Sequence, residues 1–165
     1  MTRPAFTRFW DFSLDFYARP GVPAACLELQ DRAGVDVNVL LFLLHLAAHG
    51  RALDRAGVAQ IDAAVTGWRA QVVQPLRTAR RALKAPSPAF AGADSAALRS
   101  ALKRDELEAE RIQQQTIAAL FPPATSGTAA APAAALRANL DAYAAHLGPL
   151  PAEALAVLVA RFADE

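Results

Sequence analysis

Apolar positions along this chain recur every three or four residues, which is the spacing of one face of an α-helix. The pattern predicts a first helix over residues 6–18 and a second over 23–33, ended by Gly34. A third helix is expected over 36–49, with Asp36 as its N-cap. Because apolar residues occupy every side of this third helix, we expect it to be buried at the centre of the fold.

Two longer helices follow, each with an apolar seam suited to a neighbouring helix. The first is expected over 58–84, with a kink one turn before Pro75, since proline donates no backbone hydrogen bond. The second is expected over 95–120, with Asp94 as its N-cap. The residues of its seam, two of them polar, are Leu98, Leu102, Asp105, Ala109, Ile112, Thr116 and Leu120.

The rest of the chain divides by composition. Residues 122–132 are rich in proline and alanine and carry no charge, which is typical of a linker. Alanine-rich helices are expected in 133–165, either folded onto the bundle or forming a hairpin of their own. We therefore predict an all-α protein, with a helical bundle of about five helices in 5–121 and a C-terminal alanine-rich helical hairpin.

Composition supports this fold class and suggests a compartment. Hydrophobic residues make up 54% of the 165 residues, enough for a core, and many are alanine, which favours helix. The N-terminus lacks the apolar stretch of a secretory signal. The longest apolar run, 39–44, is much shorter than the ~20 residues that span a bilayer. We therefore expect a cytoplasmic protein that does not enter a membrane.

The balance of charge argues against a nucleic-acid partner. The chain has 17 basic and 16 acidic residues. Proteins that hold nucleic acid through its phosphates usually carry a clear positive surplus. No nucleic-acid partner is expected, although a local basic patch is compatible with this balance, and the oligomeric state is left open.

Two segments resemble a catalogued family. They read FWDFSLDFY at 9–17 and ACLELQDRAGVDVN at 25–38, and further similarity extends the match to about residues 6–120. The resemblance is to a proteobacterial family of conserved proteins grouped as a domain of unknown function. It implies a small helical bacterial protein and supplies no activity, substrate or catalytic residue. The family pattern usually has an aromatic residue, often tryptophan, where this chain has His45, so it implies no metal-binding role there.

Polar side chains cluster at the turn between the second and third predicted helices. They are Glu28, Asp31, Asp36 and Asn38. Carboxylates at a helix junction can bind a ligand or act as an acid–base pair, which would make a polar pocket here. The alternative is helix capping by Asp36 and Asn38 and solvation of the other two side chains. The spacing matches no recognised metal motif, and no metal is predicted.

The arginines of the fourth predicted helix have two possible kinds of partner. Arg77 and Arg80 lie three residues apart, on one side of that helix, and can face either a phosphate or the acidic residues of the fifth helix. Asp105 lies on the predicted seam, where an unpaired buried carboxylate is costly. We therefore expect an ion pair between Asp105 and Arg77 or Arg80. An unpaired Asp105 lining a cavity would instead favour a ligand site.

The histidines and the single cysteine give little sign of chemistry. His45 and His49 have the i, i+4 spacing with which two histidines can share a metal, but no third ligand is apparent. We expect His45 in or near the core and His49 at the helix C-terminus. Cys26 is flanked by apolar residues and is expected to be a packed core thiol. No cofactor is predicted.

Two functional interpretations follow. The leading one is a non-enzymatic interaction or adaptor protein that presents a helix face, or its alanine-rich tail, to another protein, because no catalytic constellation is recognisable. The alternative is an enzyme or small-ligand-binding protein whose pocket combines the junction residues with Arg77 and Arg80. An inward-facing, desolvated junction cluster would favour the second interpretation, and an exposed, capped one would favour the first.

Overall fold

The chain forms two helical units, seen in a computed structural model that describes residues 5–91 and 94–163. One unit combines the residues up to 64 with those from 114 onward, and the other is Val65–Gln113. Both boundaries therefore fall inside helices, whereas composition placed the division at 122–132. Apart from one short two-stranded ribbon, the regular structure of these described residues is helical, and this confirms the all-α prediction.

The first three helices lie within one or two residues of their predicted positions. They are α1 (Ala5–Tyr17), α2 (Val22–Ala33) and α3 (Val37–Ala48). Helix α2 ends at Gly34, whose φ of 66° is a left-handed conformation that glycine adopts without strain. Asp36 caps α3 as predicted: its Oδ1 atom accepts hydrogen bonds from the backbone N–H groups of Asn38 and Val39.

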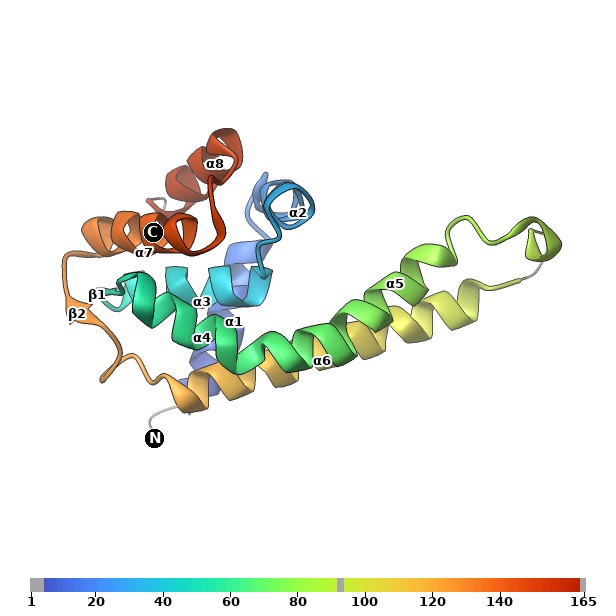
Figure 1. The fold of residues 1–165 in the computed structure, drawn as a ribbon, viewed down its shortest axis with the longest axis horizontal. Coiled ribbons are helices and arrows are strands. Elements are labelled where there is room, and N and C mark those ends of the chain that lie inside the picture. Colours follow the sequence, from blue (N-terminus) through green and yellow to red (C-terminus); the bar gives the residue numbers. More distant parts are fainter. Residues whose placement is uncertain (1–4, 92–93, 164–165) are drawn as a thin grey trace. The chain divides into compact units, whose positions relative to one another are not determined.

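Helix α3 is the centre of its unit. Its residues from Asn38 to Ala47 are all buried. Helix α1 packs against it, and so does α7 (Pro132–Leu147), while α8 (Ala152–Phe162) packs along α2 (Figure 1). The alanine-rich C-terminal helices are therefore folded onto the bundle, which is one of the two arrangements that the sequence left open. Small alanine side chains let α7 approach α3 closely, and Ala135, Ala142 and Tyr143 are buried at this contact.

The segment before α7 is held in place by backbone pairing. Strand β1 (Arg51–Ala52), which follows α3, pairs in antiparallel fashion with β2 (Thr128–Ala129). The Arg51 guanidinium also donates hydrogen bonds to the carbonyl oxygens of Ser126, at 2.7 Å, and Gly127, at 2.6 Å. The proline- and alanine-rich segment 122–132 is thus attached to the end of α3 and does not act as a free spacer.

Substituting Gly127 with alanine should disrupt this attachment. Gly127 has a φ of +64°, and a Cβ atom there would lie 2.2 Å from the carbonyl oxygen of Ala52. We expect Gly127→Ala to lower the free energy of unfolding by about 2 kcal/mol, because the β1–β2 pairing must open to relieve the clash. Urea denaturation followed by circular dichroism measures the change. Gly67→Ala is a matched control, since a Cβ atom at Gly67 meets nothing within 4 Å.

Parts of two long helical segments make up the second unit, and the first of these segments is interrupted. Helix α4 (Arg55–Trp68) continues into a π-helical turn, η1 (Arg69–Val73), and then into α5 (Gln74–Ala82). The Gln74 N–H donates to the carbonyl of Arg69, five residues earlier. This wider turn lies directly before Pro75, where a break was predicted, and it accommodates a residue that cannot donate to the helix.

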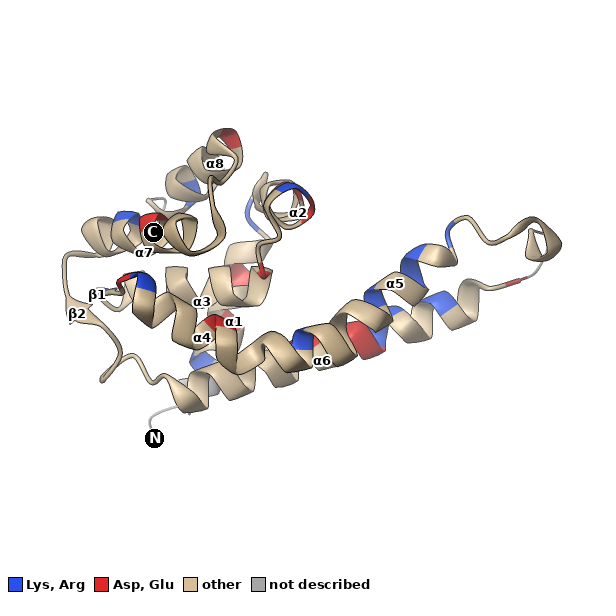
Figure 2. Cartoon of the chain, viewed as in Figure 1, with Lys and Arg blue, Asp and Glu red and all other residues tan. Residues whose placement is uncertain are grey.

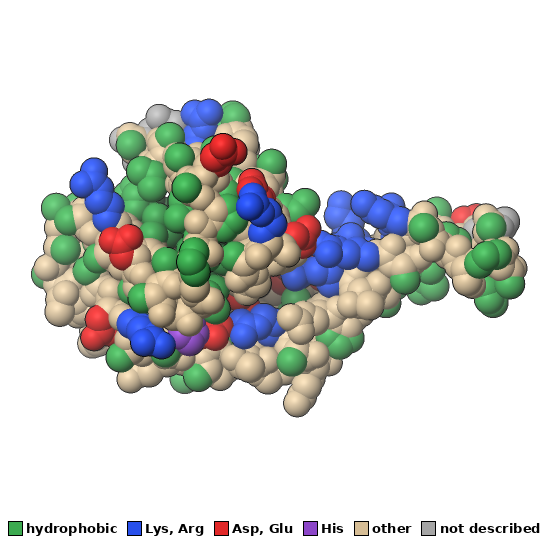
Figure 3. Space-filling model, turned by 45° about the horizontal axis from the view of Figure 1, so that its top comes forward, with side chains coloured by type: hydrophobic (Ala, Val, Ile, Leu, Met, Phe, Trp, Pro, Cys, Tyr) green, Lys and Arg blue, Asp and Glu red, His purple; other side chains and the backbone are tan. Residues whose placement is uncertain are grey.

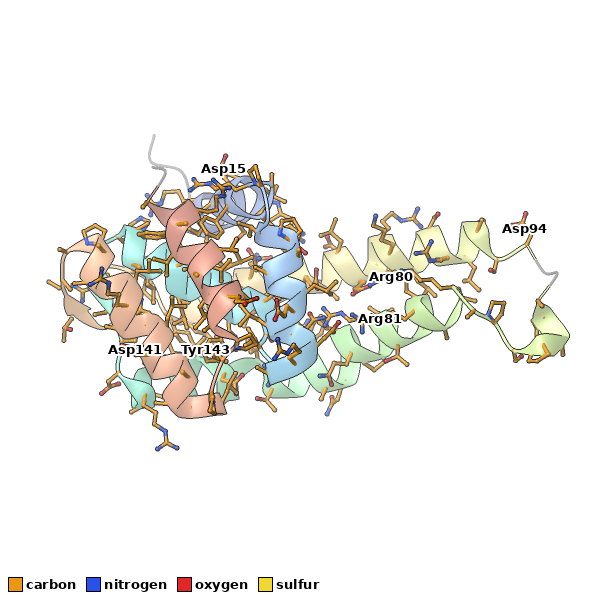
Figure 4. The ribbon with its side chains drawn as sticks, turned by 90° about the horizontal axis from the view of Figure 1, so that it is seen from above. Asp15, Arg80, Arg81, Asp94, Asp141 and Tyr143 are labelled. Carbon is orange, nitrogen blue, oxygen red and sulfur yellow. The ribbon has the colours of Figure 1, made fainter. Side chains whose placement is uncertain are left out.

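Helix α6 (Ala96–Leu120) follows a short 3₁₀ turn, η2 (Pro88–Phe90), and the Asp94 side chain accepts a hydrogen bond from the N–H of Ala96 at its start. Helix α5 and the first part of α6 lie side by side in two views (Figures 1 and 4). We call residues 65–113 the α5–α6 hairpin. Within the described ranges, no helix has both the length and the apolar character needed to cross a membrane.

Candidate functional site

The four predicted junction residues fall into two environments. Asp36 and Asn38 are buried, whereas Asp31 is exposed and Glu28 is partly exposed. Glu28 accepts a hydrogen bond from Arg32, one helical turn further along α2. The side chains split in this way because Ala25, Cys26 and Leu29 form the buried face of α2, and Glu28 and Asp31 lie outside it. The structure therefore does not bring the four together into one pocket.

The buried pair at the junction is engaged in holding the fold. The Asp36 carboxylate caps α3, and the Asp36 N–H donates to the hydroxyl of the buried Tyr143, at 3.0 Å. Asn38 Oδ1 accepts a hydrogen bond from the buried Gln114 amide, at 2.9 Å. Tyr143, labelled in Figure 4, comes from α7, and Gln114 comes from α6. The junction is thus a capped arrangement in which two later helices bind the start of α3.

His45 lies in the core, as expected, and is surrounded by rings. Its side chain is 3% exposed, and its ring centroid lies 5.2 Å from those of Phe9 and Phe12. Burial, followed by the nearby positive charges of His49 and Arg8, lowers the pKa of His45 from 6.5 to about 3. The imidazole is therefore neutral near pH 7.

The surroundings of His49 and Cys26 also agree with the positions expected from the sequence, at the end of α3 and in the core. The Nδ1 atom of His49 lies 2.9 Å from the carbonyl oxygen of His45, where it donates a hydrogen bond that closes the end of α3. Cys26 is buried, and burial raises the pKa of its thiol to about 12, so the nucleophilic thiolate is not formed near neutral pH. In the described part of the chain, no group of three His, Cys, Asp or Glu side chains is arranged to hold a metal ion.

A buried carboxylate joins the two helices of the α5–α6 hairpin. The Glu106 side chain, only 8% exposed, accepts hydrogen bonds from Arg77, at 2.8 Å, and from Arg80. Arg77 also binds Glu110, at 2.7 Å. Burial alone would raise the pKa of Glu106, but the hydrogen bonds from Arg80 and Arg77 outweigh it and lower this pKa below its usual value. The carboxylate is therefore ionised and paired.

The predicted ion pair of Asp105 with Arg77 or Arg80 is wrong, because the acid that binds both arginines is its neighbour Glu106. Asp105 is exposed. The predicted seam was aligned on the large apolar residues Leu98 and Ile112, and both of these are exposed. The buried positions of α6 are instead Glu106, Ala109, Gln113, Gln114, Ile117 and Ala118. Aligning the seam on the largest apolar side chains therefore selected Asp105, Ile112 and Thr116 in place of the adjacent buried residues Glu106, Gln113 and Ile117.

The sequence indicated that these arginines pair with the acidic residues of the next helix, and Glu106 and Glu110 are two of those acids, although Asp105 was chosen for the seam. Glu106 and Glu110 are four residues apart and so share one helix face, as Arg77 and Arg80 do three residues apart. An acidic pair on one helix and a basic pair on the adjacent helix are complementary in charge. By contrast, nothing in the sequence marks Gln114 or Tyr143 as partners of the α3 N-terminus.

The surface of the α5–α6 hairpin is apolar and basic. Phe90 is 62% exposed, Leu98 57% and Leu107 51%, and none of the residues of α5 is buried. Residues 65–113 contain nine Lys and Arg against five Asp and Glu, a net charge of +4, whereas the rest of the chain has a net charge of −3. The basic residues lie along α5 and the first turns of α6 (Figure 2), and Figure 3 shows them gathered on the surface of the hairpin.

One comparison with known proteins gives a match. A family model described as "Protein of unknown function (DUF2390)" matches residues 8–117. These residues run from within α1 to within α6, in agreement with the extent of the resemblance seen in the sequence, and α7 and α8 lie beyond the match. No curated protein and no solved structure matches the chain.

Proposed function

The chain belongs to the DUF2390 family of proteins of unknown function, and we propose that it is a non-enzymatic interaction or adaptor protein that binds another protein through its α5–α6 hairpin. The observation that carries this proposal is the concentration of large exposed apolar side chains on the hairpin. They are Trp68, Phe90, Leu98, Leu107 and Ile112.

The hairpin buries little apolar surface between its own helices. Its buried apolar residues are Val65, Val73 and Ala109, and the buried Glu106 and Gln113 take up further positions on the seam. Half of the ten exposed large hydrophobic residues of the described chain lie in these 49 residues. A pair of helices with so thin an interior gains stability when a further helix or surface covers its apolar side chains.

The two other regions proposed from the sequence have less support. Helices α7 and α8 pack on α3 and α2, so their apolar faces are already used within the chain. The enzyme or ligand-binding alternative depends on an inward-facing cluster at the junction, and there Asp36 and Asn38 are occupied by capping and by Gln114. The hairpin is therefore the better supported binding surface.

We propose that the protein works in the cytoplasm of a bacterium. Support comes from Cys26, which is a free, buried thiol, so that the fold needs no disulfide within the chain and no oxidising compartment. Fractionation of cells that carry the protein with a small epitope tag tests this location. Recovery in a periplasmic or membrane fraction would contradict it.

Site-specific crosslinking in living cells tests the adaptor proposal. A photoreactive amino acid is placed at Leu98 or Leu107, and, as a control, at the exposed Gln60 of α4. We expect both hairpin positions to yield an adduct with the same protein and Gln60 to yield none. The purified partner should then bind the double variant Leu98→Glu/Leu107→Glu at least about tenfold more weakly than wild type, a loss of ~1.4 kcal/mol. Equal adducts at all three positions, or none, would contradict the proposal.

A further inference from the structure

Positive charge is concentrated at the end of the α5–α6 hairpin that adjoins its connecting loop. Residues 77–104 contain seven Lys and Arg and one acid, Asp94, which caps α6. The acids of α6 lie beyond this range, between Asp105 and Glu110. We call residues 80–104 the loop end of the hairpin. The charge of Arg77 and Arg80 is compensated by Glu106 and Glu110.

Helical spacing places further cations on the same seam. Arg99, Lys103, Glu106 and Glu110 follow one another at intervals of four, three and four residues, and therefore share the face of α6 that meets α5. On α5, Arg77 and Arg80 share a face in the same way, and Lys84 follows in the turn after the helix. Two cations of α6 thus occupy, toward the loop, the positions that two acids occupy further along. Figure 4 shows Arg80 and Arg81 on the side of α5 that faces α6.

These added cations have no internal counterion in the described part of the chain. Arg99, Lys103 and Lys84 take part in no ion pair there, and the Nε atom of Arg99 is buried without a hydrogen-bond partner. Like charges at this spacing destabilise a helical pair. These cations therefore lower the stability of the hairpin. An anion supplied from outside the chain would offset their repulsion by pairing with them.

From this geometry we propose that the partner of the loop end is an acidic amphipathic helix of another protein, whose carboxylates pair with Arg99, Lys103 and Lys84. The inference rests on the proposed adaptor function and specifies the chemistry of its partner. Glu106, held between Arg77 and Arg80, shows that this seam binds a carboxylate in two-arginine geometry. The partner repeats that pairing one turn closer to the loop.

The apolar side chains favour a protein partner over a nucleic acid. Phe90 and Leu98 are exposed beside the cations of the loop end. A phosphodiester backbone offers no apolar surface to cover Leu98, whereas an amphipathic helix presents acidic and apolar residues together. The acidic helix therefore satisfies the charge and the apolar surface at once.

Binding of defined probes to the full-length protein tests the inference. The probe is a synthetic amphipathic helical peptide with glutamate on its polar face and leucine on its apolar face. Its control has glutamine in place of every glutamate, and a duplex DNA and a single-stranded RNA of similar length are the competing polyanions. We expect the acidic peptide to bind with an affinity that falls as salt rises, and the glutamine peptide to bind at least about tenfold more weakly.

Variants assign the effect to the loop end. Arg99→Gln/Lys103→Gln should weaken binding of the acidic peptide about tenfold. The matched control, Arg55→Gln/Arg137→Gln, removes two exposed cations outside the hairpin and should leave the affinity within about twofold. Arg99→Gln/Lys103→Gln should also increase the protection of α5 and α6 amides from hydrogen exchange, because repulsion between cations is removed. A purely structural role of these cations would lower the protection.

Each failure has a distinct meaning. Four results overturn the acidic-helix inference. In the binding experiment they are equal affinity for the glutamine and acidic peptides, no binding of either peptide, and a preference for DNA or RNA. The fourth is lower amide protection in Arg99→Gln/Lys103→Gln. A cellular partner that crosslinks at Leu98 and binds this variant as tightly as wild type overturns the inference and leaves the adaptor function standing. The absence of any crosslinked partner removes the adaptor function itself.

Discussion

Asn139→Leu is expected to lower the free energy of unfolding by about 3 kcal/mol. Asn139, on α7, is fully buried and forms three hydrogen bonds to backbone groups. Its Oδ1 accepts from the Leu53 N–H, at 2.7 Å, and its Nδ2 donates to the carbonyls of Leu43, at 2.9 Å, and Arg51, at 3.1 Å. Leucine has a similar volume and can make none of these bonds, so the Leu53 N–H would be buried without a partner.

Urea denaturation monitored by circular dichroism gives the size of this effect. Arg137→Leu is the matched control, because Arg137 is exposed on the same helix and the change should stay within about 0.5 kcal/mol. A loss below about 1 kcal/mol for Asn139→Leu would show that the backbone groups around residue 139 find other partners.

Acid should destabilise the protein through His45. The pKa of His45 is about 3 in the folded chain, against 6.5 for an unperturbed histidine. Above pH 6.5 the imidazole is neutral in both states and has no effect. Between pH 6.5 and 3 the unfolded chain binds a proton that the folded chain excludes, so stability falls as the pH falls. The loss from this one group is about 2–3 kcal/mol at pH 4.5.

His45→Phe tests this pH dependence. Phenylalanine suits a site lined by Phe9, Phe12 and Phe42, and it has no proton to bind. We expect the difference in unfolding free energy between pH 7 and pH 4.5 to shrink by about 2–3 kcal/mol in the variant. His49→Gln keeps the buried imidazole and should retain most of the wild-type difference. If the free energy of unfolding changes with pH in the same way in wild type and His45→Phe, the acid destabilisation does not come from His45.

Helices α1 to α3 could be predicted closely because their signals are local. Gly34 ends α2 and Asp36 caps α3 through groups within a few residues of each other. The burial of α3 also follows from its own residues, which are apolar on every side. Pro75 likewise marked the place of the π-helical turn η1, since the missing donor is a property of that residue alone.

The candidate site was less predictable because it depends on contacts between distant helices. The phase of α6 against α5 decides whether Asp105 or Glu106 meets the arginines, and a shift of one residue turns a side chain by about 100°. Similarly, the sequence grouped Glu28 with Asp36 because they are close in the chain. Asp36 is buried together with Tyr143, which lies 107 residues further along and binds Asp36 but not Glu28. Gln114 likewise binds Asn38, 76 residues earlier in the chain.

The pairing of β1 with β2 joins residues 51–52 to 128–129, so the first unit is built from two widely separated pieces of chain. During synthesis, α3 emerges long before α7, which covers part of its apolar surface. At ribosomal rates of about 5–20 residues per second, α3 remains partly uncovered for several seconds. Folding of the first unit is therefore completed only after α7 and α8 have been synthesised and can cover α3 and α2.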